Sequence, residues 1–139
     1  MSEIKQVIVM RTKYPDGNGG VTGVRKGKLR AQAAHASMKI FFDRAEIEWV
    51  GPRIKMELCL TPEMEIWSTG SFAKIVVYVD TEEELLALHE KALASDLPAA
   101  IIQDSGRTEF HGKPTYTALA IGPHNSELID KITGHLPLL

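Results

Sequence analysis

The sequence lacks the features of a secreted or membrane protein. Cys59 is its only cysteine, so neither a disulfide framework nor a cysteine-based zinc site can form, and a single thiol fits a reducing compartment. No run approaches the roughly 18 apolar residues that a membrane span needs. The first residues lack the basic start and long apolar core of a signal peptide. We therefore expect a cytoplasmic protein that does not bind a membrane.

Two common catalytic motifs are incomplete. Several glycines precede Lys28, as in the phosphate-binding P-loop. However, Thr22 stands where that motif requires its first glycine, and Leu29 stands where it requires serine or threonine. His89 is followed by Leu93 where the helix of a zinc protease would carry its second histidine. The sequence therefore predicts neither nucleotide hydrolysis nor a zinc-protease site.

The charges are divided unevenly along the chain. The net charge is only −2, which taken alone argues against a general nucleic-acid binder. However, residues 1–44 hold nine Lys/Arg and three Asp/Glu, whereas residues 45–139 hold seven and fifteen. Unless folding mixes the two halves, this division predicts a basic patch for a polyanion on an acidic body.

Apolar runs and turn signals predict one α/β domain over residues 1–139, with a partly parallel sheet and helices on its faces. Residues 13–24 are turn-rich and predict a mobile loop, and residues 46–72 are ambiguous apart from a helix start at Thr61-Pro62. The expected strands cover 4–11, 73–79, 99–102 and 116–121, and the expected helices cover 26–44, 81–95 and 125–133.

Four cations crowd the start of the first expected helix: Arg25, Lys26, Lys28 and Arg30. A helix N-terminus is partly positive, so each cation costs about 0.3–1 kcal/mol there at low salt. The arrangement is therefore typical of a helix start that receives an external anion such as phosphate.

A polar stripe follows on the same helix. Lys28, Gln32, His35 and Lys39 stand at i, i+4, i+7 and i+11, which places them on one narrow face. Their spacing fits two interpretations equally well: the stripe faces water, or it lines a cleft that holds an anion.

A second polar group follows the third expected strand, at Gln103–Thr108. Ligands of α/β sheets gather beyond the carboxyl ends of parallel strands. There Asp104 could accept a proton or orient a neighbour, and Arg107 could grip a phosphate through two hydrogen bonds. Taken alone, Asp104-Ser105-Gly106 is also an everyday turn.

These segments together closely resemble the type 2 peptidyl-tRNA hydrolases of archaea and eukaryotes. The resemblance is carried, in order, by Lys26-Gly27-Lys28, Gln32, His35-Ala36, Ile102–Thr108, Thr117, Ile121-Gly122-Pro123 and Asp130–Leu136. It implies a three-layer sandwich with a four-stranded mixed sheet between helices, a homodimer, and cleavage of the ester between a peptide and its tRNA without metal or organic cofactor.

The resemblance also implies roles for individual residues. The positions that match its active-site set are Lys28, Gln32, His35, Asp104, Thr108 and Thr117. Those expected to contact tRNA are Lys26 and Arg107, to which we add Arg25, Arg30 and Lys39. Three features depart from the family pattern: Arg30 replaces a small residue, the 13–24 link is longer, and the 46–72 stretch is expanded. The two longer segments could alter which tRNA or peptide is accepted.

Ester hydrolysis needs a positioned water, a base and a donor for the oxyanion. Either His35 or Asp104 could be the base, and we favour Asp104, acting through water with Thr108. Lys28 would stabilise the oxyanion or hold the terminal ribose-phosphate, while Gln32 and Thr117 orient these groups. Two alternatives stay open: a catalytically idle relative that binds tRNA or a protein, and an esterase for another acyl ester.

Overall fold

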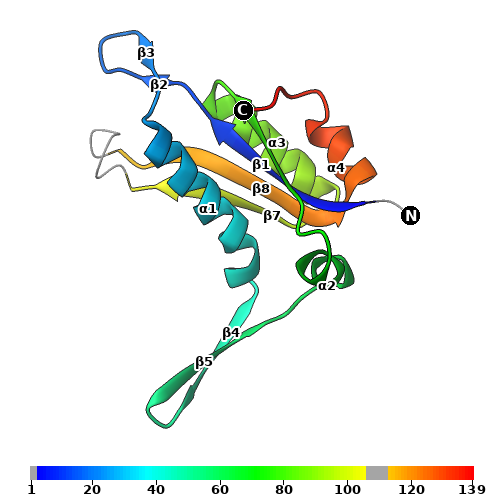
Figure 1. Ribbon diagram of the computed structural model, residues 1–139. Coiled ribbons are helices and arrows are strands. Elements are labelled where there is room, and N and C mark those ends of the chain that lie inside the picture. The colour runs from blue at the N-terminus through cyan, green and yellow to red at the C-terminus, as the bar shows by residue number, and fades with distance from the viewer. Residues whose placement is uncertain (1–2, 106–112) are drawn as a thin grey trace.

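A four-stranded sheet forms the centre of the molecule (Figure 1). The structure is a computed structural model that describes residues 3–105 and 113–139. The strand order is β6-β1-β8-β7, in which β1 and β6 are parallel and β8 is antiparallel to both of its neighbours. The mixed sheet predicted from the sequence is thus confirmed. Its strands are β1 (Ile4–Arg11), β6 (Lys74–Val79), β7 (Ala99–Asp104) and β8 (Thr115–Asn125).

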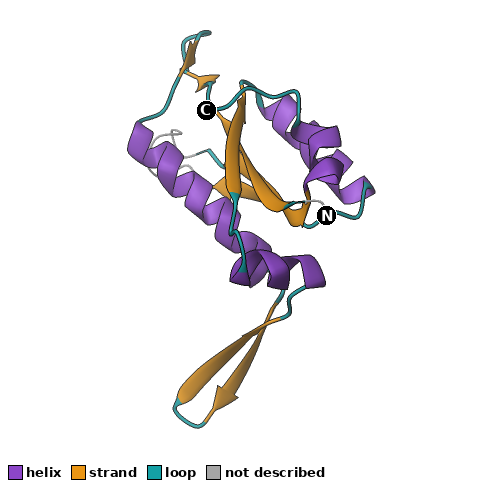
Figure 2. Ribbon diagram, turned by 45° about the vertical axis from the view of Figure 1, so that its right-hand side comes forward, coloured by secondary structure: helices purple, strands orange, loops and turns teal. Residues whose placement is uncertain are grey.

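Helices cover both faces of the sheet, so the body has three layers (Figure 2). One face packs against α1 (Lys26–Phe42) and α2 (Pro62–Thr69), and the other against α3 (Glu82–Ala94) and α4 (Ser126–Thr133). This arrangement confirms the predicted sandwich.

The strands bury both of their faces. Along β1, Val7 and Val9 join the core beneath α3 and α4, whereas Ile8 and Met10 join the core beneath α1 and α2. All four side chains are at most 4% exposed. A continuous apolar run is what such a doubly covered strand requires.

Three helices begin at the caps that the sequence predicts. The side chains of Thr61, Thr81 and Asn125 each accept backbone N–H groups from the first turns of α2, α3 and α4. Each satisfies donors that the helix itself cannot pair. At α3, Oγ1 of Thr81 also donates a hydrogen bond of 2.9 Å to Oε1 of Glu84, so the two residues of the predicted capping box are in contact through their side chains.

One polar contact ties α1 to the sheet inside an apolar layer. Gln6 of β1 has no exposed surface. Its Oε1 accepts a hydrogen bond of 2.6 Å from Oγ of Ser37, and its Nε2 donates to the carbonyl of Gly122 at 3.3 Å. Gly122 has φ +90°, and a Cβ there would lie 2.7 Å from the carbonyl oxygen of Lys5. Glycine is therefore required at this position.

The 13–24 segment contains a short hairpin that the sequence did not predict. Its strands are β2 (Tyr14–Pro15) and β3 (Val21–Thr22). Within the turn, the Asp16 carboxylate accepts the backbone N–H groups of Asn18 and Gly20 at 2.7 and 3.0 Å. The mobility of this segment stays a prediction.

The ambiguous 46–72 stretch begins with a longer hairpin. Its strands are β4 (Ala45–Val50) and β5 (Arg53–Leu58), and we call residues 45–58 the arm. The arm extends away from the sheet beyond the end of α1 (Figures 1 and 2). Trp49 at its tip is 73% exposed, whereas Trp67 of α2 is 2% exposed and stacks on Phe41.

None of the described helices is long and apolar enough to cross a membrane.

Candidate active site at the carboxyl end of β7

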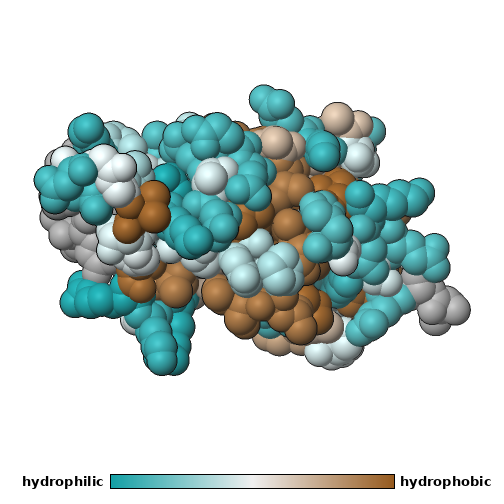
Figure 3. Space-filling view, turned by 90° about the horizontal axis from the view of Figure 1, so that it is seen from above, coloured by the Kyte–Doolittle hydropathy of each residue, from teal (hydrophilic) through white to brown (hydrophobic). Residues whose placement is uncertain are grey.

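Helix α1 begins beside the carboxyl end of β7 (Figure 1). Arg25 takes the N-cap position without a capping hydrogen bond from its side chain, and the first turn holds no acidic residue. Arg25, Lys26 and Arg30 are all exposed, so the predicted basic helix start is confirmed. The surface is mostly hydrophilic on the side where this helix start and the β2–β3 hairpin lie (Figure 3).

Lys28 and Asp104 form an ion pair across 76 residues of sequence. Lys28 Nζ lies 2.7 Å from Asp104 Oδ2, and the two side chains are 15% and 12% exposed. The pair is therefore largely desolvated, yet solvent still reaches both groups. Removing one partner of such a pair typically costs about 3–5 kcal/mol, because the other charge stays buried without compensation.

Gln32 connects this pair to the sheet. It lies one turn after Lys28, and its Nε2 donates to the same Asp104 oxygen at 2.9 Å. Its Oε1 accepts a hydrogen bond of 2.6 Å from Oγ1 of Thr117. Gln32 is 3% exposed and Thr117 is fully buried. Because both ends of the Gln32 amide are occupied, its orientation is fixed, and with it the position of the carboxylate oxygen.

A β-bulge brings Thr117 to this face of the sheet. Ile102 pairs with Ala118, but the next residue, Gln103, pairs with Tyr116, so Thr117 is the extra residue on β8. Ala118 packs beneath α1 and Tyr116 packs on the α3 side. Without the bulge, strict alternation would turn Thr117 towards α3. With it, two consecutive side chains face α1, and a bulge commonly re-aims a side chain beside a functional site in this way.

The polar stripe of α1 divides into two parts. Lys28 and Gln32 face the sheet, whereas His35 is exposed and forms no hydrogen bond or ion pair with another residue of the described ranges. Lys39 pairs with Asp43 one turn later at 2.8 Å. The cleft interpretation thus fits the first half of the stripe, and the solvent interpretation fits the second. The predicted residues Arg107 and Thr108 lie outside the described residues.

A cavity of about 280 Å³ opens at the same end of the sheet, but neither Lys28 nor Asp104 lines it. It lies between the β2–β3 hairpin, the start of α3 and the start of β8, where Thr115 pairs with Asp104 in the strand register. Arg11 lines the cavity; it is 7% exposed and lies 4.3 Å from the centre of the Tyr14 ring. Arg11 was not among the site residues predicted from the sequence, and its position at the end of the apolar strand β1 is the signal that could have suggested it.

The chemistry that this arrangement supports is that of proton transfer beside a fixed cation. Asp104 offers a carboxylate oxygen that can accept a proton, and Lys28 offers an ammonium for a developing negative charge. No three His, Cys, Asp or Glu residues in the described ranges lie close enough together to hold a metal ion.

Comparison with known proteins identifies the family. A family model described as "Peptidyl-tRNA hydrolase PTH2" matches residues 4–139. The chain is 38% identical over 136 residues to the peptidyl-tRNA hydrolase of Methanocaldococcus jannaschii, which covers 98% of this chain and all of that protein. It is 40% identical over 140 residues to that of Staphylothermus marinus, covering 99% of this chain and 97% of the relative. Given this match over nearly the whole sequence, the chain belongs to the peptidyl-tRNA hydrolase PTH2 family.

Proposed function

We propose that this protein hydrolyses the ester between a peptide, or an N-blocked amino acid, and the 3′ end of tRNA. The observation that supports it best is the 2.7 Å contact between Lys28 and Asp104 in a chain of this family. The two groups come from distant parts of the sequence and meet at the carboxyl end of β7, where both side chains stay partly exposed. The basic start of α1 adds the charge that an RNA substrate requires.

In the proposed reaction, Asp104 accepts a proton from a water molecule as its oxygen attacks the ester carbonyl carbon. The carbonyl oxygen becomes an oxyanion, which the Lys28 ammonium stabilises. As the intermediate collapses, the bond between the carbonyl carbon and the ribose oxygen breaks. Asp104 returns the proton to that oxygen, so the products are a free carboxyl group and a free tRNA hydroxyl.

The remaining members of the network position these two groups. Gln32 holds the Asp104 oxygen, and Thr117 holds Gln32, so neither needs to touch the substrate. We keep Asp104 as the base because Lys28 and Gln32 both hold its carboxylate, whereas no hydrogen bond of the described residues connects His35 to this network. Thr108 stays in the proposal through the family resemblance alone.

Different parts of the protein contact the two parts of the substrate, the tRNA and the acyl group. The proposal assigns Arg25, Lys26, Arg30 and Arg107 to tRNA phosphates, and assigns Lys39 a smaller share because Asp43 already neutralises it. The 13–24 segment lines the cavity together with Thr115, the strand partner of Asp104, and we therefore assign this segment a role in choosing the peptide. Action on tRNA fits a cytoplasmic location, and a homodimer is the assembly expected from the resemblance.

The test uses purified protein and N-acetyl-aminoacyl-tRNA, with release of tRNA as the readout. We expect Asp104→Asn and Lys28→Ala each to lower turnover by about 10²–10³-fold, with far smaller effects on tRNA binding. The matched control is Asp130→Asn, because Asp130 pairs with Lys5 at the same 2.7 Å but on a distant surface. That variant should retain turnover.

The same assay separates the alternatives. Binding of the substrate without release would identify an idle tRNA-binding relative. Cleavage of small esters without action on the tRNA ester would identify a different esterase. Near-normal turnover of either site variant would remove that residue from the chemistry.

A further inference from the structure

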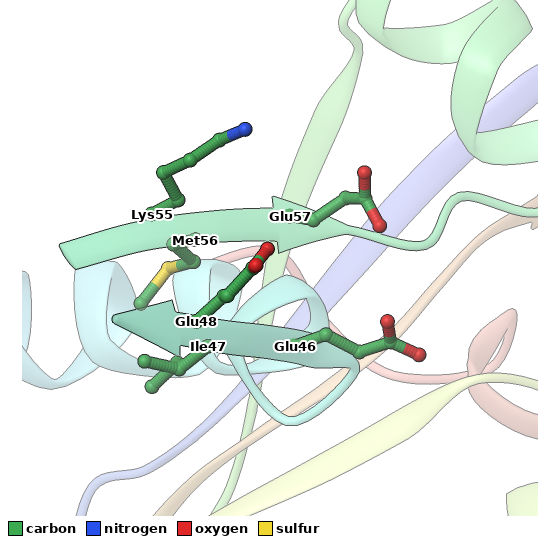
Figure 4. A pocket seen from close by; sticks show the side chains of 6 residues that line it. All are labelled: Glu46, Ile47, Glu48, Lys55, Met56 and Glu57. Carbon is green, nitrogen blue, oxygen red and sulfur yellow. The ribbon is translucent and has the colours of Figure 1, made fainter. Parts of the chain in front are cut away.

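Two hollows in the described part of the surface differ in how far their charged groups are shielded from water. The hollow on the arm is lined by Glu46, Ile47, Glu48, Lys55, Met56 and Glu57 (Figure 4). All six of these residues are exposed. The cavity of about 280 Å³ that the 13–24 segment lines contains Arg11, which is only 7% exposed. Because a charge shielded from water interacts more strongly with a ligand, the second cavity is the better candidate for a binding site.

Arg11 ends β1 with its side chain on the α3 side of the sheet. Val7 and Val9 of the same strand join the core beneath α3 and α4, and Arg11 continues this alternation. Its Nε donates to the carbonyl of Lys13 at 2.9 Å, and its Nη1 donates to the carbonyl of Tyr116 at 3.3 Å. A guanidinium has five N–H groups. Since the described residues accept only these two hydrogen bonds from it, donors remain for a ligand in the cavity.

Glu82, in the first turn of α3, places an acceptor beside these donors. Its Oε1 lies 3.7 Å from Nη1 of Arg11, which is an ion-pair contact but is longer than a hydrogen bond. Both side chains line the cavity. The cavity therefore presents a donor and an acceptor side by side, and their opposite charges balance. The ligand that fits this pair is a neutral group that carries its own acceptor and donor next to each other.

We propose that Arg11 and Glu82 bind the main chain of the substrate's peptide, at a residue beyond the one that is esterified to tRNA. In an extended chain, the N–H and C=O of one residue point to the same side, which is how paired strands exchange two hydrogen bonds. Arg11 donates to this C=O, and Glu82 accepts from this N–H. The inference rests on the proposed function, and it adds the preferred class of substrate: a peptide rather than a single blocked amino acid.

The topology of the sheet sets the length of peptide that this contact needs. Arg11 ends β1 and Asp104 ends β7, and both strands are neighbours of β8. Two strand spacings amount to about 10 Å. An extended chain covers about 3.4 Å per residue, so the residue that reaches Arg11 is about the third from the ester. The path passes the start of β8, where Thr115 lines the cavity and is the strand partner of Asp104.

Two other parts of the substrate fit the cavity less well. A phosphate is disfavoured because Glu82 places a carboxylate 3.7 Å from the guanidinium. A nucleobase carries both an acceptor and a donor, but unpaired RNA bases usually also stack on an aromatic ring. Tyr14 lines the cavity, but it is 3% exposed, and the guanidinium of Arg11 lies 4.3 Å from the centre of its ring. The ring is therefore already covered.

Substrates of increasing peptide length test the proposal. Release of tRNA is measured with one tRNA that carries N-acetyl-alanine, or the same acetyl group on two, three or four alanines. For the wild type, we expect kcat/KM to rise by about 10-fold or more between one and three alanines and then to stay level. A hydrogen bond to a charged group contributes a factor of this size. The change should lie in KM, because the contact is remote from the bond that breaks.

Glu82→Ala should remove most of this rise. The matched control is Glu83→Ala, because Glu83 is exposed on the same first turn of α3 but does not line the cavity. Both variants remove one carboxylate from the helix start, so a loss of helix stability affects them alike. Arg11→Lys is a second test. It keeps the positive charge but loses the forked donors, so it should also reduce the rise.

The outcomes separate this inference from the proposed function. A wild type that releases tRNA at a rate independent of peptide length would overturn the inference alone. So would a Glu82→Ala variant that keeps the rise, or one that loses the same factor with every substrate, as expected if the cavity held the 3′ end of the RNA. Release from none of the substrates would refute the proposed hydrolase activity, and this inference with it.

Discussion

Thr117→Val replaces one hydroxyl group of the candidate site with a methyl group. Valine has nearly the same shape as threonine, so the packing in β8 is retained. The substitution leaves Gln32 Oε1 without its donor in a place where Gln32 is only 3% exposed. An unsatisfied buried acceptor costs about 1–3 kcal/mol of stability, and we expect a loss in that range by urea denaturation.

The effect on turnover should exceed the effect on binding. Once Gln32 is no longer fixed, it can rotate, and Asp104 loses the hydrogen bond that sets its position. A displacement of about 1 Å in a catalytic group can lower the rate by about 100-fold. We therefore expect kcat of tRNA release to fall by roughly 10–100-fold, with KM little changed because Thr117 is buried and away from the substrate.

Thr133→Val is the control for the loss of a buried hydroxyl. Thr133 is 3% exposed, and it donates to the carbonyl of Ile129 within α4, on the opposite face of the sheet. It should reduce stability without lowering kcat. The positional role of Thr117 would be refuted by a normal kcat in Thr117→Val, or by an equal loss of kcat in both variants.

Three further predictions concern binding, pH and the backbone. Lys26→Ala should weaken tRNA binding and flatten its salt dependence more than Lys39→Ala does, because Lys39 is already paired; binding titrations over a salt series measure both. Burial lowers the pKa of His89 against a smaller opposing effect of Glu90, so the unfolded chain takes up a proton below pH 6.5 more readily than the folded chain does. Stability should therefore fall as the pH drops below about 6.5, and His89→Gln should reduce that loss in urea denaturation at several pH values. Gly122→Ala should cost about 2 kcal/mol or more, because φ is +90° and the new Cβ meets the Lys5 carbonyl, and a wild-type melting curve would contradict this.

The elements that were predicted well depend on local signals. β1 is a continuous apolar run, and α3 begins at Thr81 with Glu84 three residues later; both signals act within a few residues and match the structure. The arm was missed even though Ile47 and Trp49 alternate with glutamates. A strand of this kind normally faces a core, and the sequence offered no core for it to face.

The candidate site depends on contacts that no local pattern contains. Period-two alternation along β8 would place Thr117 with Leu119 on the α3 face, and only the shifted register turns it to Gln32. Its inclusion among the site residues came from the family resemblance and not from spacing. The spacing along α1 likewise grouped His35 with Lys28. Spacing alone does not show which residues of that stripe pack against the sheet and which face solvent.

The contact between Gln6 and Ser37 has a consequence for the alignment of α1. The helix packs on the sheet through Ala33 and Ala36 together with the larger Leu29, Ile40 and Phe41. Apolar contacts of this kind are non-directional. Two hydrogen bonds between α1 and the sheet set the position of the helix along its axis. Gln32 bonds to Thr117, and Ser37 bonds to Gln6 further along the helix. If the helix moved along its axis by one turn, about 5.4 Å, both hydrogen bonds would break. The side chains of all four residues would then be left without partners in an apolar layer. The helix is therefore held in one longitudinal setting, the one in which an ammonium from its first turn meets a carboxylate at the end of β7.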